Sequence, residues 1–285
     1  MSSLDLHQAA YAQAVASKRR RLWLGLLALI VCILISGQVA EISFSKLHQN
    51  IGSFTSYFVR IFHLENGQLV FTDVGEWFWG WKKWLVLMGE TLLMAYVGTL
   101  VGAAVALVLC FFASKNITKN SVVVVASRRF LEFSRTVPEM VFALIFVVAF
   151  SLGPLPGVLA LAIHTGGALG KLFAEVVENI DLKPVDGIVA SGGTWLQKVR
   201  FGVLPQVASN FASYALLRFE INVRGAAVLG FVGAGGIGQT LLEVIRKFYY
   251  SDISALLVMI LVTVMLIDAI TERVRYRLLG KEAKQ

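Results

Sequence analysis

Long hydrophobic runs separated by short polar segments form the main pattern of this chain. An α-helix needs about 20 apolar residues to cross a bilayer. Six runs approach or exceed that length: residues 22–39, 91–113, 137–152, 158–177, 207–232 and 253–270. The pattern predicts an all-α, polytopic membrane helix bundle with about six transmembrane helices. Gly98 and Gly102 in the second run, like Gly166 and Gly170 in the fourth, have the spacing that lets helix backbones approach closely in lipid.

The composition supports a membrane protein. Of the 285 residues, 57% are hydrophobic and only 15% are charged, whereas soluble domains carry about 25% charged residues. Such a chain is too apolar for an ordinary aqueous surface and for intrinsic disorder. Cys32 and Cys110 both lie inside apolar runs, so we expect small buried packing residues and neither a disulfide framework nor a metal site.

The N-terminal third is organised differently from the rest. Residues 1–21 are polar and end in four basic residues, and the run that follows could be a signal peptide. Its length and Gln38 near the possible cleavage site favour a retained span. Residues 40–84 have mixed polarity and end in a segment, 77–84, with four tryptophans, which is typical of a membrane-interface anchor; a carbohydrate-stacking patch is the alternative.

The domain organisation follows from these segments. We expect residues 1–90 to form an N-terminal tail, the first transmembrane helix and a periplasmic or interfacial segment. Residues 91–277 would form the transmembrane core, and 278–285 a C-terminal cytoplasmic tail.

The net charge of +8 is compatible with nucleic-acid binding or with membrane topology. With the N-terminus in the cytoplasm, 17 of the 26 Lys and Arg residues fall on cytoplasmic segments and six on outer segments. Positive charge concentrates on the cytoplasmic side of membrane proteins. The distribution predicts that both termini are cytoplasmic, and it explains the charge without nucleic acid.

One glycine-rich motif could suggest an enzyme. Gly233, Gly235 and Gly238 match G-x-G-x-x-G, but dinucleotide binding requires a preceding strand in a βαβ unit, and here a long apolar run precedes the motif. We interpret residues 233–238 as a tight turn before an interfacial helix. No phosphate-binding loop, H-E-x-x-H, cysteine pair or G-x-S-x-G occurs. The chain is therefore predicted to be no enzyme, with no catalytic residue, cofactor or metal of its own.

The polar connection before the fifth run carries the most informative pattern. Residues 186–205 predict a short helix, a glycine break at Gly192, a second amphipathic helical piece and a proline, Pro205, that opens the next run. Such a mixture of apolar and basic side chains suits contact with another protein. An ordinary loop between spans is the alternative.

This stretch resembles the permease subunit of type I ABC importers. That family carries Glu-Ala-Ala, three residues, Gly, and then a fixed interval to Leu-Pro. Asp186 falls at the Glu position, Gly192 at the Gly, and Leu204 and Pro205 at the Leu-Pro, whereas Gly187 and the residue after it replace the two alanines.

The resemblance covers about residues 91–277, and within the family it is most similar to phosphonate- and phosphite-type permeases. It rests on short segments at residues 139–143, 153–154, 163–166, 202–206 and 218–224.

Several properties are implied by this resemblance. The chain would be the non-catalytic permease of an importer in the bacterial inner membrane, moving a phosphorus oxyanion from periplasm to cytoplasm by alternating access. It would pair with a second permease chain, as a homodimer within membrane lipid, with two ABC ATPase subunits that bind ATP and Mg, and with a periplasmic substrate-binding protein. Five residues would couple the chain to the ATPase: Asp186, Gly187, Gly192, Leu204 and Pro205.

Ionisable residues inside spans are costly and mark candidate functional positions. Glu139, His164, Glu220 and Arg224 lie in or at the ends of apolar runs, and we expect them to line the substrate pathway. An anion needs hydrogen-bond donors along its path, and His164 and Arg224 can supply them.

Ion pairing between packed helices is the alternative role for such charges. Lys171 and Glu175 are spaced to pair, as are Glu220 and Arg224. Arg218 is expected near the middle of its span, paired with an acidic neighbour.

Two other functions stay open at this stage. The same machine could carry another small solute such as methionine. A secondary transporter driven by an ion gradient would require inverted repeats with interrupted helices, and no such internal symmetry is evident in the sequence.

Overall fold

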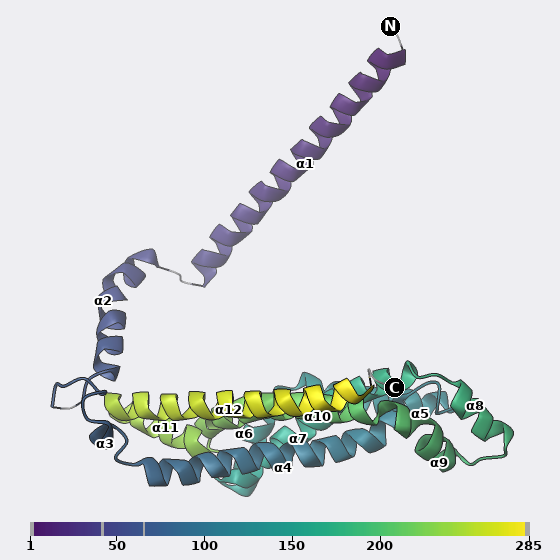
Figure 1. Ribbon diagram of the computed structural model, residues 1–285. Coiled ribbons are helices and arrows are strands. Elements are labelled where there is room, and N and C mark those ends of the chain that lie inside the picture. Colours follow the sequence, from purple (N-terminus) through teal and green to yellow (C-terminus); the bar gives the residue numbers. More distant parts are fainter. Residues whose placement is uncertain (1–2, 41–42, 65, 283–285) are drawn as a thin grey trace. The chain divides into compact units, whose positions relative to one another are not determined.

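The computed structural model describes residues 3–40, 43–64 and 66–282, and the described residues are helical apart from turns and one isolated bridge between His63 and Leu69 (Figure 1). This confirms the all-α prediction. The chain divides into two compact units, one up to Val59 and one from Arg60 onward.

The first unit consists of two helices. α1 runs from Ser3 to Val39, and its residues 15–39 are long and apolar enough to cross a membrane. α2, Phe44–Ile61, was not predicted, because its apolar residues are interspersed with polar ones and form no long run; Ile51, Phe54 and Phe58 recur at helical spacing on one face. Cys32 is exposed on α1, so the expectation of a buried cysteine is correct for Cys110 and wrong for Cys32.

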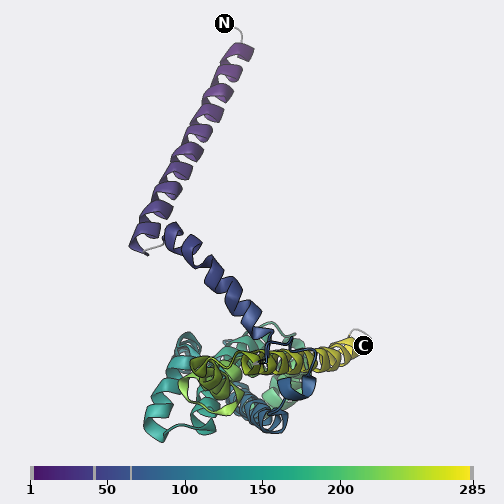
Figure 2. The same cartoon turned by 90° about the vertical axis from the view of Figure 1, so that its left-hand side faces the viewer.

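The second unit is a bundle of helices (Figures 1 and 2). Its helices are α3 (Val74–Trp77), α4 (Trp81–Ala113), α5 (Ser121–Thr136), α6 (Glu139–Phe150), α7 (Pro154–Glu178), α8 (Lys183–Ala190), α9 (Trp195–Gln197), a π-helical turn (Lys198–Val203), α10 (Leu204–Leu229), a 3₁₀ turn (Gly230–Val232), α11 (Gly236–Lys247) and α12 (Tyr250–Glu282). The predicted tail, 278–285, begins within α12, and residues 283–285 lie outside the described part.

Four described helices are long and apolar enough to cross a membrane, and up to six spans result if each of two bent pairs counts as one. α5 and α6 form the first pair, bent by 85°, and α11 with the segment 195–232 forms the second, bent by 48°. The predicted third span, 137–152, is therefore only α6, and the predicted connection before it is helix α5. Pro138 has no N–H to continue the helical ladder and precedes the first residue of α6, so the helix breaks there.

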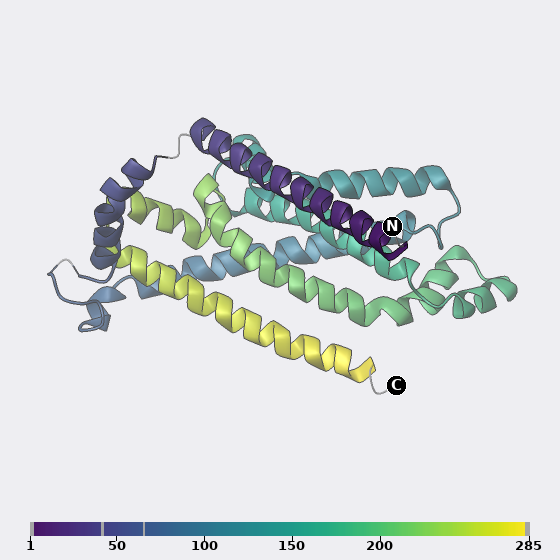
Figure 3. The same ribbon diagram turned by 90° about the horizontal axis from the view of Figure 1, so that it is seen from above.

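Close contact between α4 and α7 forms the centre of the second unit. A Cβ at Gly98 would lie 2.7 Å from Cβ of Leu161, and one at Gly102 would lie 2.8 Å from the carbonyl oxygen of Ala162. The glycines of α4 thus allow the two backbones to approach, as their spacing predicts. Figure 3 shows α10 and α12 running side by side along the same bundle.

The glycine-rich motif is a turn, as predicted. A helix precedes it rather than a strand, and Gly233, Gly235 and Gly236 all have positive φ angles. The Gly153 N–H donates to the Gly233 carbonyl at 3.1 Å, which ties the motif to the start of α7.

The tryptophan-rich segment, expected as an interface anchor, has two buried and two exposed indoles. Trp77 and Trp84 are buried, whereas Trp79 and Trp81 are exposed. The indole N–H of Trp79 donates to Asp252 at 2.9 Å, and that of Trp77 donates to Ser254 at 2.9 Å. Two of the indoles that we expected to meet water therefore bind α12.

Candidate functional site: a polar cluster within the bundle and an exposed connecting loop

The connecting loop, residues 179–203, presents most of the predicted coupling residues to the surroundings. Asp186 lies in the first turn of α8 and is exposed, like Gly187 and Gly192, whereas Leu204 is half-buried. Pro205 is the second residue of α10, directly after the π-helical turn Lys198–Val203, and it has no N–H to donate to that turn.

Gly192 produces the reversal between the two helical pieces of this loop. Its φ of +77° lies in the left-handed region, which favours glycine. The Gly192 N–H donates to Val189 O at 3.0 Å and the Gly193 N–H to Ile188 O at 2.9 Å, which closes the end of α8. Thr194 and Gln197 then form a capping box that starts α9.

Apolar side chains point both inward and outward from the loop. Val185, Val199 and Val203 are buried in the core that they share with α7 and α10. Leu196 and Phe201 are 68% and 60% exposed. An anchored loop that exposes large apolar side chains is a suitable protein-contact surface.

A second group of polar residues meets inside the bundle, where α6, α7 and α10 come together. His164 Nδ1 lies 3.1 Å from a carboxylate oxygen of Glu139, and it is also hydrogen-bonded to the guanidinium of Arg218. Arg218 Nη2 lies 4.0 Å from the same Glu139 oxygen. The structure thus brings two predicted pathway residues together around Arg218, whose acidic neighbour is Glu139 on another helix.

Uncharged polar residues extend this cluster toward α4. The amide Nδ2 of Asn222 donates to Oγ1 of Thr99 and of Thr165, at 2.8 Å each. Arg218 Nε donates to the same Thr165 hydroxyl at 3.4 Å. We did not predict Asn222, Thr99 or Thr165 as site residues. The sequence signal that could have identified them is that each is an uncharged polar residue within an apolar run. We call these six residues the central cluster: Thr99, Glu139, His164, Thr165, Arg218 and Asn222.

The predicted pair of Glu220 and Arg224 does not form. Arg224 donates instead to Asp268 on α12 at 2.5 Å, and Glu220 accepts a hydrogen bond from Thr271 on the same helix. Glu220 and Arg224 therefore each bind α12 rather than each other, and neither belongs to the central cluster.

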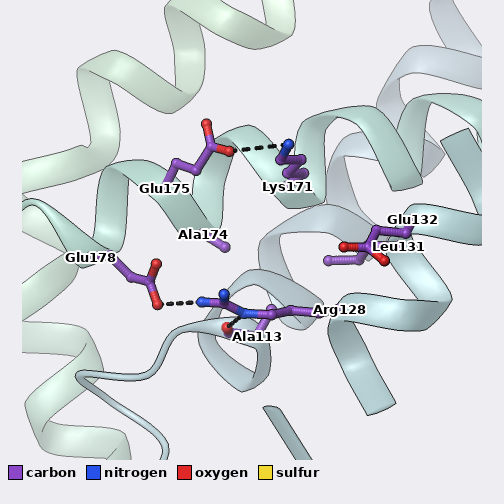
Figure 4. A pocket seen from close by; sticks show the side chains of 8 residues that line it. All are labelled: Ala113, Arg128, Leu131, Glu132, Lys171, Ala174, Glu175 and Glu178. Carbon is purple, nitrogen blue, oxygen red and sulfur yellow. Dashed lines mark hydrogen bonds and ion pairs between the residues drawn. The ribbon is translucent and has the colours of Figure 1, made fainter. Parts of the chain in front are cut away.

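The predicted pair of Lys171 and Glu175 does form, with 3.4 Å between the charged atoms. Glu178, one turn further along α7, pairs with Arg128 of α5 (Figure 4). Among the described residues no group of three His, Cys, Asp or Glu side chains could hold a metal ion.

The central cluster combines hydrogen-bond donors with one carboxylate, a set of groups that can bind an anion. The Arg218 guanidinium and the His164 imidazole can donate hydrogen bonds, whereas both N–H groups of the Asn222 amide are used by Thr99 and Thr165, and the Glu139 carboxylate limits the positive charge. Because electrostatic interactions strengthen away from water, such donors could contact a passing anion strongly, and the carboxylate would oppose permanent retention.

Comparisons with known proteins agree with this architecture. The phosphite transport system permease protein PtxC of Stutzerimonas stutzeri is 41% identical over 192 residues, which cover 67% of this chain and 70% of that protein. The phosphate-import permease protein PhnE of Mycolicibacterium smegmatis is 39% identical over 179 residues, covering 63% of this chain and 34% of that protein.

Among solved structures, the MetNI methionine ABC transporter in an inward-facing conformation matches with a TM-score of 0.61 and 21% identity, covering 68% of this chain and 95% of the matched chain. Residues 98–281 match the family described as binding-protein-dependent transport system inner membrane component. This range covers most of the second unit, including the central cluster residues and the connecting loop, and the chain therefore belongs to that family of permeases.

Proposed function

We propose that this chain is the transmembrane subunit of an ATP-driven importer that carries phosphonate, phosphite or a related phosphorus oxyanion from the periplasm into the cytoplasm. The observation that carries the proposal is the 41% identity to a phosphite permease over two thirds of both chains. The second relative is named for phosphate import, which extends the expected substrates to tetrahedral phosphorus oxyanions as a class.

Alternating access requires an energy source outside this chain. Two ABC ATPase subunits, which bind ATP and Mg, would bind the connecting loops of two permease chains. The chain would lie in the bacterial inner membrane, with both termini in the cytoplasm. The exposure of Asp186, Gly187 and Gly192 together with Leu196 and Phe201 supports the loop as the contact surface.

The coupling residues have distinct roles in this proposal. Asp186 offers a carboxylate to the ATPase. Gly187 has no side chain, so the ATPase can approach the backbone of α8 closely there. Gly192 sets the reversal through its positive φ, while Leu204 and Pro205 fix where α10 begins.

The central cluster would lie on the substrate pathway. Arg218 and His164 would donate to the oxyanion as it passes, and Glu139 would hold these two side chains in place when no substrate is present. Glu220 and Arg224, which contact α12, are a second candidate position along the pathway.

Methionine is the alternative cargo, because the matched solved structure is a methionine transporter. At 21% identity that likeness shows the fold alone, so the phosphorus oxyanion has stronger support. An ion-driven secondary transporter would need no ATPase.

The substrate class is tested by competition. The permease, its ATPase and its periplasmic binding protein are reconstituted in liposomes with ATP, and uptake of labelled phosphite is measured against excess phosphonate, phosphate or methionine. We expect phosphorus oxyanions to be taken up or to compete, and methionine to have no effect. Uptake of methionine with no uptake of any phosphorus oxyanion would contradict the proposal.

A further inference from the structure

One carboxylate fastens the start of the connecting loop to the neighbouring helices. Glu178 is the last residue of α7, and its Oε1 accepts hydrogen bonds from the Lys115 backbone N–H at 2.8 Å and from the Arg128 guanidinium (Figure 4). Arg128 Nε donates in turn to the carbonyl of Ala113, the last residue of α4, at 2.8 Å. The ends of α4 and α7 and the middle of α5 therefore meet at a single ion pair.

Two neighbouring bonds strengthen the same junction. Asn116 Nδ2 donates to the Val177 carbonyl at 2.7 Å, and the Ser114 hydroxyl lies 3.4 Å from the Ala174 carbonyl. The last four carbonyls of a helix have no partner within the helix, and the Asn116 side chain, from the turn between α4 and α5, satisfies one of them, that of Val177. The end of α7 is thereby tied to that turn.

Gln206 attaches the loop to α10. Its side-chain oxygen accepts from the Asp181 N–H at 3.1 Å, and its Nε2 donates to the carbonyls of Asp181 at 3.0 Å and Gly202 at 2.6 Å. The two ends of the loop are therefore held together by one amide. A displacement of the loop would be transmitted to α10 through Gln206 and to α4 and α5 through Glu178.

The ion pairs around the junction differ in what they connect. Lys171 and Glu175 pair within α7, and Arg129 and Glu132 pair within α5 at 2.6 Å. Arg128 and Glu178 join two helices. All three pairs lie close together (Figure 4 draws Lys171–Glu175 and Arg128–Glu178), and of the three only Arg128–Glu178 links one helix to another.

We propose that Glu178 and Arg128 are positioning residues that transmit movement of the connecting loop to α4 and α5. The inference rests on the proposed function, because it takes the loop as the part moved by the ATPase. Charge-assisted hydrogen bonds are stronger than neutral ones, and here they end on two backbone groups as well as on each other. Without the carboxylate charge, the loop and the last turn of α7 can shift while the turn between α4 and α5 lags behind.

The test compares Glu178→Gln with Glu175→Gln in the full complex reconstituted in liposomes. Glu178→Gln keeps the side-chain length and an acceptor oxygen but removes the charge, and Glu175→Gln makes the same change where no second helix is involved. We expect Glu178→Gln to assemble and hydrolyse ATP but to import at least about fivefold less substrate per ATP, within the range by which residues along a coupling route act. Glu175→Gln should stay within about twofold of wild type.

Arg128→Gln and the double variant test whether the two residues act as a unit. Since both single changes break the same connection, the double variant should lose no more coupling than either single variant. Additive losses would contradict the proposal, and so would ATP hydrolysis and uptake falling in proportion, because that pattern indicates a folding defect. Wild-type coupling in Glu178→Gln would overturn it directly.

A substrate-independent measurement separates this inference from the proposed function. Spin labels on two exposed positions, Ser191 in the loop and Val125 in α5, report the distance between the two elements with and without a non-hydrolysable ATP analogue. We expect that distance to stay constant in wild type and to change in Glu178→Gln. A distance that behaves alike in both would refute the inference even if no phosphorus oxyanion were transported; absence of uptake by the wild-type complex would refute only the substrate.

Discussion

Arg218 is the residue on which the proposed anion pathway depends most. It lies in the middle of α10, its side chain is 13% exposed, and its contacts are His164, Thr165 and Glu139. A cation in a span is costly unless it is paired or functional. Its partial pairing, at 4.0 Å from the carboxylate, leaves donors that a substrate could use.

We expect Arg218→Gln to lower uptake by the reconstituted complex about tenfold or more, which corresponds to a loss of about 1.4 kcal/mol of interaction with the passing anion. Arg129→Gln, a change to an exposed ion pair of α5, is the control and should transport normally. Initial rates of labelled substrate uptake measure the effect.

The double variant Glu139→Gln with Arg218→Gln distinguishes pathway from structure. It removes both charges, so any folding defect caused by an unpaired Glu139 is relieved. Transport should stay low if Arg218 contacts the substrate. Recovery of transport to the wild-type rate would show that Arg218 serves only to neutralise Glu139.

Arg224 and Asp268 give a separate prediction about stability. One Asp268 oxygen accepts from Arg224 at 2.5 Å and the other is buried without a partner. Arg224→Gln leaves this carboxylate without its cation, and because the two side chains are 49% and 38% exposed it should lower stability by up to about 1 kcal/mol. Thermal unfolding in detergent measures the loss, and adding Asp268→Asn should restore most of it. Rescue by Glu220→Gln instead would mean that the pair expected from the sequence is the real one.

At the scale of single elements, the connecting loop depends on the backbone of Gly192. No atom lies within 4 Å of a Cβ built there, so only its φ of +77° restricts substitution. The left-handed conformation costs an ordinary residue about 1–2 kcal/mol, and asparagine adopts it more readily than β-branched residues.

Gly192→Val should therefore weaken association with the ATPase and lower uptake, whereas Gly192→Asn should retain both. Co-purification with the ATPase, together with ATP hydrolysis by the purified complex, measures the difference. Gly89→Ala is a control for insertion and folding, because Gly89 lies in α4, outside the connecting loop, with free space around it. Equal behaviour of the Val and Asn variants would show that the reversal at Gly192 is unimportant.

Elements with a continuous apolar run could be predicted from the sequence, and elements with mixed polarity could not. α4, α7 and α10 follow their runs, and Gly98 and Gly102 mark the contact of α4 with α7. α5 was missed because Arg128, Arg129 and Glu132 interrupt its apolar pattern, although its buried face contains Val124 and Leu131.

The candidate site shows the same division. Glu139 and His164 stood out as ionisable residues in apolar runs and do lie together. The partner of Arg224 could not be found from local spacing, because Asp268 is 44 positions away on another helix. Helical spacing identifies neighbours on one helix, whereas packing decides which charges on different helices meet.

At the scale of the whole molecule, the second unit combines a polar cluster inside the bundle with an exposed loop at the ends of α7 and α10. The contacts of Glu178 and Gln206 connect that loop to α4, α5 and α10. A bundle built in this way can change state when its loop is moved, provided that each state is favoured by different contacts. The proposed ATPase would meet this requirement by moving the loop.

The energy requirement is measured most directly in liposomes that contain either the permease with its ATPase or the permease alone, each supplied with the periplasmic binding protein and labelled phosphite. We predict uptake only in the first preparation, only with hydrolysable ATP, and with no response to a proton or sodium gradient. Uptake by the permease alone along an ion gradient would contradict the account.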